Sequence, residues 1–229
     1  MHPIGIRPAI VDRVLLRRGR LHLHDRLDPA RTALVVIDMQ EGFVAPGAPA
    51  EVPAARAICA NINTLAAALR ARGGKVVWVL HANATDGTRS DWSGFMDNFV
   101  AAELRHATIA ALAPGGKGQA VWRECTVAPG DLTVTKNRYS AMIAGSSALE
   151  RTLRSFGIDT VLIAGTKTNV CCESTARDAM MLDFKVVMVE DACAALSDEE
   201  HRATLENIVQ QFGDVRTTAD TVGLLGPPR

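Results

Sequence analysis

The sequence predicts an α/β fold of three layers (α/β/α), with helices on both faces of a central, mainly parallel sheet of six strands. Short runs of β-branched and other apolar residues alternate along the chain with longer segments of helical spacing. Each run is apolar throughout, which is typical of a strand buried on both faces. Aromatic residues make up only 4% of the 229 residues, which favours a helix-covered parallel sheet over a β-sandwich.

In chain order, the first strand is expected at 32–37. A loop rich in Gly and Pro follows it to about residue 53, so no helix is expected directly after this strand. The other strands are predicted at 76–80, 131–135, 160–164, 185–189 and 215–217. Helices are predicted at 54–72, at about 99–112, at 146–156, after residue 171 through 181, and from 197 onward.

The composition indicates one domain, residues 32–229, because no linker or repeat divides it. Residues 1–31 form a basic arm that is expected to wrap the domain or a partner subunit. Lys+Arg and Asp+Glu balance at 25 each, so we expect neither nucleic acid nor an anionic membrane as a partner. No apolar run approaches the roughly 20 residues that span a bilayer, and the N-terminus does not resemble a signal peptide. A cytoplasmic protein is therefore expected.

The five cysteines do not suggest a disulfide framework, because their number is odd and the chain is long. They favour a reducing compartment, in agreement with a cytoplasmic location. The sequence contains no CxxC pair and no Cys/His cluster at zinc-binding spacing. We therefore expect no metal and no other cofactor.

Three reactive side chains lie where predicted strands end: Asp38, Lys136 and Cys171. Right-handed crossovers bring such strand ends to one edge of a parallel sheet. A thiol at a strand–helix junction is expected to ionise more easily, and a carboxylate and an ammonium beside it suit nucleophilic catalysis. Among the six histidines only His81 ends a strand, so a Cys/His pair is less favoured. The plainer alternatives are a small buried cysteine and a loop or helix-capping aspartate.

Three motifs occur in order on the predicted elements: VVIDMQ at 35–40, TKNRYSA at 135–141, and GTKTNVC with ESTARDA at 165–179. Over about residues 30–220 the sequence resembles the isochorismatase-like cysteine hydrolases, nearest their ureidoacrylate and N-carbamoyl amidohydrolase branch. The resemblance implies a Rossmann-like sheet and a homodimer or homotetramer.

The resemblance also implies roles for individual residues. Asp38 would be the general base, Lys136 would lie beside it, and Cys171 would be the nucleophile, with Cys172 pointing into the core. A cis peptide would precede Lys167, and the backbone N–H groups of Lys167 and Cys171 would form an oxyanion hole.

The activity implied is hydrolysis of a C–N bond in a small amide, ureido or N-carbamoyl compound through a thioester. Alternatives are the vinyl ether hydrolysis of the isochorismatase branch, which does not need the cysteine, and a non-catalytic binding role. A redox role for the adjacent Cys171 and Cys172 is less favoured, because neighbouring cysteines form a strained disulfide. Nicotinamidases of this superfamily bind a metal through an Asp-x-His pair and a further His. Here the loop after Asp38 contains no His, and His81 is alone. A metal-dependent nicotinamidase is therefore disfavoured.

The loops at 41–52 and 82–98 are expected to contact the substrate. Candidate pocket walls are Phe43, Asn83, Trp92 and Tyr139. For Trp92 a place in the core or in an interface is an equal alternative. A lone histidine at a strand end, such as His81, is more often a hydrogen-bonded structural residue or a substrate contact than a metal ligand.

Overall fold

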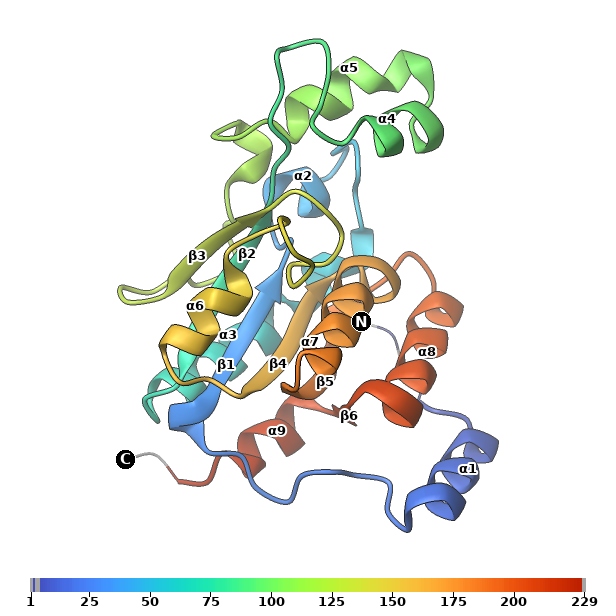
Figure 1. The fold of residues 1–229 in the computed structure, drawn as a ribbon, viewed down its shortest axis with the longest axis vertical. Helices are drawn as coiled ribbons and strands as arrows, with labels where there is room; N and C mark the ends of the chain where they lie inside the picture. Colours follow the sequence, from blue (N-terminus) through green and yellow to red (C-terminus); the bar gives the residue numbers. More distant parts are fainter. Residues whose placement is uncertain (1, 3–4, 228–229) are drawn as a thin grey trace.

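The protein, described by a computed structural model for residue 2 and residues 5–227, is built around six parallel strands in the order β3-β2-β1-β4-β5-β6 (Figure 1). This confirms the predicted fold class, and each strand begins within one residue of its predicted start. The strands are β1 (Thr32–Ile37), β2 (Lys75–His81), β3 (Leu132–Lys136), β4 (Thr160–Thr166), β5 (Lys185–Ala194) and β6 (Asp214–Arg216).

Helices precede, separate and follow these strands. The α-helices are α1 (Pro8–Arg18), α2 (Glu41–Val44), α3 (Cys59–Arg70), α4 (Ser93–Phe99), α5 (Ala102–Ala111), α6 (Leu149–Ser155), α7 (Glu173–Met181), α8 (Asp198–Asn207) and α9 (Thr218–Leu224). Short 3₁₀ turns are η1 (Pro29–Arg31), η2 (Pro53–Ile58) and η3 (Lys117–Gln119), and π-helical turns are η4 (Thr168–Cys172) and η5 (Ile208–Phe212). None of the helices in the described part of the chain is both long and apolar enough to cross a membrane.

The expectation that no helix directly follows the first strand is wrong. Helix α2 begins at Glu41, three residues after Asp38, and its N-cap is Gln40. The Gly and Pro residues that indicated a loop lie within this single turn or beyond its end. Asp38 is therefore not the capping residue of a helix, and its carboxylate is available for another contact.

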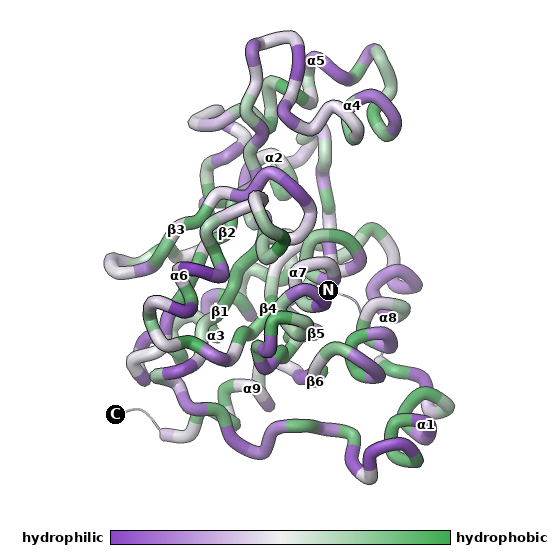
Figure 2. The backbone as a smooth tube through the Cα atoms, viewed as in Figure 1, coloured by the Kyte–Doolittle hydropathy of each residue, from purple (hydrophilic) through white to green (hydrophobic). Residues whose placement is uncertain are grey.

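Both faces of the sheet are buried, because alternate residues of each strand enter two separate hydrophobic clusters. In β1, all of whose residues are inaccessible to solvent, Val35 packs on one side and Val36 on the other. Helices α6, α7 and α8 cover one face, and α3 and α9 cover the other. Figure 2 shows the strands as hydrophobic segments inside more hydrophilic connections. Each fully buried Val, Leu or Ile contributes about 1.5–3 kcal/mol to this core.

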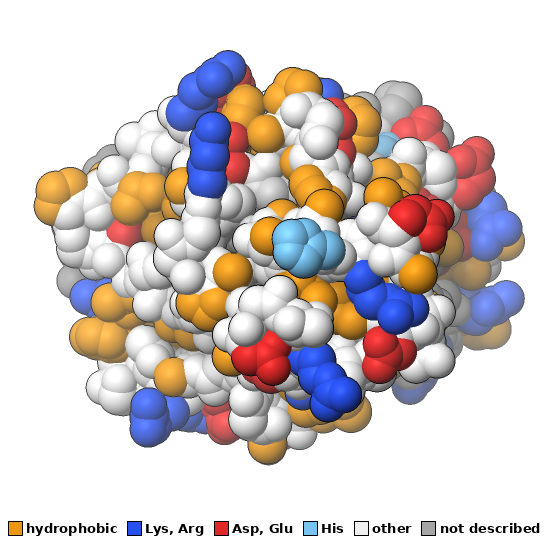
Figure 3. Space-filling model, turned by 90° about the horizontal axis from the view of Figure 1, so that it is seen from above, with side chains coloured by type: hydrophobic (Ala, Val, Ile, Leu, Met, Phe, Trp, Pro, Cys, Tyr) orange, Lys and Arg blue, Asp and Glu red, His pale blue; other side chains and the backbone are white. Residues whose placement is uncertain are grey.

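The order of the strands along the sheet changes direction between β1 and β4. From β1 it proceeds through β2 to β3 at one edge, and it then returns to β4 on the other side of β1. Ligands of open α/β sheets bind beyond the carboxyl ends of strands at such a switch point. Helices α4 and α5 lie beyond these strand ends (Figure 1). Figure 3 shows this end of the molecule, where hydrophobic side chains lie between scattered charges of both signs.

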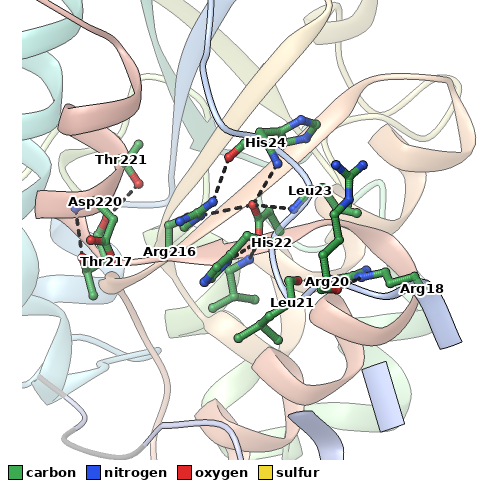
Figure 4. Close-up of polar contacts among 12 residues, drawn as sticks. Arg18, Arg20, Leu21, His22, Leu23, His24, Arg216, Thr217, Asp220 and Thr221 are labelled. Atoms are coloured by element: carbon green, nitrogen blue, oxygen red, sulfur yellow. Dashed lines mark hydrogen bonds and ion pairs between the residues drawn. The ribbon is translucent and has the colours of Figure 1, made fainter. Parts of the chain in front are cut away.

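The N-terminal arm packs against its own domain wherever the structure describes it. Helix α1 begins with Pro8 at its first position and ends at Gly19, whose φ of 74° permits a left-handed cap. The Arg7 guanidinium binds the Glu206 carboxylate of α8. Farther along, His22 and Arg216 both contact the buried carboxylate of Asp214 (Figure 4). A role of the arm at a subunit interface stays a prediction.

Candidate active site

The structure brings the side chains of Asp38, Lys136 and Cys171 together at the switch point. Asp38 follows β1, Lys136 is the last residue of β3, and Cys171 lies in the π-helical turn η4 after β4. The Lys136 Nζ atom is 2.9 Å from Asp38 Oδ2 and 3.5 Å from Cys171 Sγ. Asp38 and Lys136 are completely buried and Cys171 is 5% exposed.

Asp38 is held in an unusual backbone conformation. Its φ of 53° lies in the left-handed region, which aspartate tolerates better than most residues. The Asp38 N–H donates to the carbonyl of Val79 on β2 at 2.9 Å. Its carboxylate forms an ion pair with Lys136, and its hydrogen-bonding contacts with Lys136 and with the Cys171 thiol help to raise the pKa of both groups.

The thiol of Cys171 is protonated at neutral pH in this environment. Burial raises its pKa to about 12; the Lys136 ammonium opposes this change and the Asp38 carboxylate adds to it. The expectation of an easily ionised thiol at the strand–helix junction is therefore wrong for the resting site. Burial is the largest contribution to the pKa of this thiol, so its ionisation requires a base.

Lys136 remains an ammonium although it is fully buried. Burial alone would lower its pKa, but the Asp38 carboxylate, followed by the contact with Cys171, raises it above the ordinary value. Its Nζ atom also lies 3.1 Å from His81 Nδ1 and 3.1 Å from the carbonyl oxygen of Arg138. Burial, together with the Lys136 charge, lowers the pKa of His81 to about 4, so the imidazole is neutral.

A small pocket of about 110 Å³ opens onto the Cys171 thiol. Three of the predicted wall residues line it: Phe43, Trp92 and Tyr139. The Trp92 ring lies 4.7 Å from Tyr139 and 4.9 Å from Phe95, so it packs with neighbouring aromatic rings and also faces the pocket. The walls are thus mainly apolar and include four aromatic side chains.

Asn83 does not line this pocket. Its side chain is buried, its Oδ1 lies 2.7 Å from His81 Nε2, and its Nδ2 donates to Asp91 and to the carbonyl of Asn137. All of its hydrogen-bonding groups except one acceptor site are thereby used inside the protein. The structure therefore gives Asn83 a place behind the pocket wall.

A wider cleft of about 630 Å³ adjoins the pocket, and Trp92 and Tyr139 line both of them. Its other walls include Arg138, Ser174 and Arg177. The guanidinium of Arg138 lies over the Trp92 ring, 5.2 Å from its centroid.

The segment that carries the thiol has the backbone that the resemblance implied. The Thr166–Lys167 peptide bond is cis, and Lys167 and Cys171 both line the pocket. The next residue, Thr168, contacts His201 Nδ1 through its hydroxyl at 2.9 Å. Cys172 is completely buried in the core. In the ranges 2 and 5–227, no group of three His, Cys, Asp or Glu side chains is arranged to hold a metal ion.

Sequence reasoning missed the part that His81 plays beside Lys136, and it missed Phe95, Leu112 and Val170 as pocket walls. The signal for His81 was present, because it ends a strand in the same way as Asp38 and Lys136 do. In the sheet, His81 and Lys136 are direct register partners on adjacent strands. The aromatic and aliphatic walls carry no such signal, because they resemble ordinary core residues.

The fold and this buried group of carboxylate, ammonium and thiol define an α/β protein with the site of a cysteine hydrolase. The profile of the Isochorismatase domain matches residues 32–220. The chain therefore belongs to the isochorismatase family, as its motifs suggested.

Relatives of known name support this assignment. The ureidoacrylate amidohydrolase RutB of Enterobacter sp. (strain 638) is 34% identical over 214 residues, which cover 87% of this chain and 91% of the relative. The cysteine hydrolase of Pseudomonas syringae pv. phaseolicola 1448A has a TM-score of 0.77 and 30% identity, covering 87% of this chain and 94% of that one. N-carbamoylsarcosine amidase of Thermoplasma acidophilum has a TM-score of 0.65 and 26% identity, covering 82% and 96%.

Proposed function

We propose that the protein is a cysteine-dependent amidohydrolase that cleaves a C–N bond of a small amide, ureido or N-carbamoyl compound. The observation that carries this proposal is the position of Lys136 Nζ between Asp38 Oδ2 and Cys171 Sγ in a buried pocket. Relatives named ureidoacrylate amidohydrolase and N-carbamoylsarcosine amidase support the same class of reaction.

In the proposed reaction, Asp38 removes the proton of the Cys171 thiol. A base is needed because the pKa of this thiol is raised to about 12 by burial, and the Asp38 carboxylate is in hydrogen-bonding contact with the thiol. The thiolate attacks the substrate carbonyl, and the backbone N–H groups of Lys167 and Cys171 stabilise the oxyanion. One such donor typically contributes about 3–4 kcal/mol.

The C–N bond then breaks, and the proton held by Asp38 goes to the departing amine or ammonia. Water attacks the Cys171 thioester, releases the acid product and restores the thiol. Throughout, Lys136 neutralises the negative charge that moves between the carboxylate and the sulfur. The small, mainly apolar pocket favours substrates of few atoms with an apolar or planar group next to the carbonyl.

The proposal is tested by an ammonia-release screen of small amides, ureido acids and N-carbamoyl compounds, with isochorismate as a comparison substrate. We expect release from at least one C–N substrate. Mass spectrometry of a quenched reaction should find an acyl adduct on the peptide that contains Cys171. Turnover of isochorismate without any release of ammonia would overturn the proposed function.

Adjacent cysteines provide a matched pair of variants for this test. We expect Cys171→Ala to abolish turnover and adduct formation, because the nucleophile is lost. Cys172→Ala should retain turnover, because this side chain packs in the core and does not line the pocket. Full activity in Cys171→Ala would contradict the proposed nucleophile.

A further inference from the structure

The ammonium of Lys136 has more acceptors around it than it has hydrogens. It carries three N–H bonds. His81 Nδ1 and the carbonyl oxygen of Arg138 each lie 3.1 Å from Nζ in hydrogen-bond geometry. Cys171 Sγ at 3.5 Å and Asp38 Oδ2 at 2.9 Å compete for the one remaining N–H bond.

The direction of every hydrogen bond behind His81 is determined by the groups at the two ends of the chain. At one end, the Lys136 ammonium can only donate, so His81 Nδ1 must carry the lone pair. At the other end, the Asp91 carboxylate accepts from Asn83 Nδ2 at 2.7 Å. Asn83 Oδ1 is therefore the atom that accepts from His81 Nε2 at 2.7 Å. Only one tautomer of His81 fits these contacts.

The backbone of His81 is held equally firmly. Its N–H donates to Gln40 Oε1 at 2.7 Å, and its carbonyl accepts from Gln40 Nε2 at 3.0 Å. Gln40 lies two residues after Asp38, so the same loop positions the carboxylate and the imidazole. Asp91 is bound a second time, by Asn137 Nδ2 at 2.9 Å, directly after Lys136 in the sequence.

We propose that His81 is a positioning residue that occupies one N–H bond of Lys136, and that Asn83 and Asp91 hold it in the tautomer that can do so. With the Arg138 carbonyl occupying a second N–H, a single N–H remains for Asp38 and Cys171. This N–H is shared between the carboxylate and the sulfur, and it shifts towards the sulfur as the proton moves from the thiol to Asp38. The inference rests on the proposed function in taking Cys171 as the nucleophile.

The consequence is a thiol that stays protonated until a substrate is present. If a second N–H were available, Lys136 could bind both Asp38 and Cys171 at once and stabilise a resting thiolate. The charged and titratable groups that face this cluster are Asp38 after β1, His81 on β2, Asp91 before α4, and Tyr139 and Lys167 at the pocket. The variants below leave all of them unchanged except His81.

Two substitutions of His81 separate its two nitrogen atoms. In His81→Asn, the amide oxygen takes the place of Nδ1, so Lys136 keeps its acceptor and the contact to Asn83 is lost. In His81→Gln, the amide nitrogen takes the place of Nε2, so the contact to Asn83 is kept and Lys136 loses its acceptor. Both variants remove the ring, and thermal unfolding shows whether both fold.

The readout is the rate at which iodoacetamide alkylates Cys171 between pH 7 and 9, followed by peptide mass spectrometry. We expect alkylation to be about threefold faster in His81→Gln and unchanged in His81→Asn. A thiol pKa lower by about one unit gives about tenfold more thiolate, which its lower nucleophilicity partly offsets. Equal rates in His81→Gln and the unsubstituted protein, or equal changes in both variants, would overturn the proposal.

A second measurement does not depend on any variant. Nitrogen NMR of the ¹⁵N-labelled protein should show His81 at neutral pH with a proton on Nε2 and none on Nδ1. A proton on Nδ1 would overturn the proposal. Neither readout requires turnover, so a failed substrate screen with the expected alkylation rates would count against the proposed function and leave the role of His81 intact.

Discussion

At the scale of single residues, Asp38 combines a left-handed backbone with a buried ion pair, and this makes Asp38→Asn informative. Asparagine also tolerates the left-handed region, so the backbone should not change. The substitution leaves the Lys136 ammonium buried without its counter-charge, which typically costs about 3–5 kcal/mol of unfolding free energy. Loss of the base should lower turnover by about 100-fold or more. Urea unfolding and the ammonia assay measure the two effects.

The double variant Asp38→Asn with Lys136→Met separates stability from activity. Replacing both members of a buried ion pair is often nearly neutral, so much of the lost unfolding free energy should return. Turnover should stay absent, because neither charge is restored. A double variant that is as unstable as Asp38→Asn alone would show that the ion pair is not the source of the loss.

Buried neutral histidines give the protein a defined pH dependence of stability. Burial lowers the pKa of His81 and of His201 to about 4, from about 6.5 in the unfolded chain. Between pH 4 and pH 6.5 the unfolded state binds more protons than the folded state. The contribution of these histidines to the unfolding free energy is therefore largest above about pH 6.5, and it decreases as the pH falls towards 4. Each histidine contributes up to about 3 kcal/mol. Urea unfolding at pH 7 and 4.5 should show a smaller loss in His81→Asn than in the unsubstituted protein.

At the scale of elements, Gly165 of β4 lies directly against the backbone of Ile37 in β1. Its φ is 114°, and a Cβ atom there would lie 2.1 Å from the carbonyl oxygen of Ile37. Gly165→Ala should therefore destabilise the protein by about 3 kcal/mol or more, from the backbone conformation and the steric overlap together. Gly94→Ala is the control, because nothing lies near its Cβ position and its φ is ordinary. Equal thermal midpoints for the two variants would contradict this account.

The strands could be predicted from sequence because each is a continuous apolar run, and the capping box of Ser197 and Glu200 at α8 could be recognised as well. Helices α1, α4 and α9 were missed. They are short or rich in polar residues, and each buries only one or two side chains, such as Ile10 and Val14 of α1. Their positions follow from tertiary contacts, which local periodicity does not encode.

The part of the candidate site that could be predicted consists of the reactive residues at strand ends. Asp38, Lys136 and Cys171 follow from that pattern and from the motifs. The raised pKa of the thiol does not, because it depends on burial by side chains that are distant in the sequence. Asn83 was predicted as a pocket wall because it follows β2, and it does lie near the pocket. Its side chain, however, contacts His81 and Asp91 instead of lining the pocket.

At the scale of the whole molecule, the arm is attached to the domain through the buried Asp214 carboxylate. Its oxygens accept from the Leu23 N–H and from Arg216, and His22 contacts it at 2.9 Å. Asp214→Asn should weaken this attachment, because the amide carries no charge and has one acceptor atom instead of two. We expect faster cleavage by trypsin at the arginines of residues 7–20, with Asp97→Asn on the exposed surface as a control. Unchanged cleavage would show that other contacts suffice to hold the arm.

The seam between β1 and β4 has a consequence for the order in which the chain is made. Asp38 and Lys136 lie in the half of the sheet that a ribosome completes first, and Cys171 follows in the second half. A nascent chain that ends before β4 already contains Asp38 and Lys136, but it lacks Cys171. The reactive centre is therefore complete only after β4 and the turn that follows it have been synthesised.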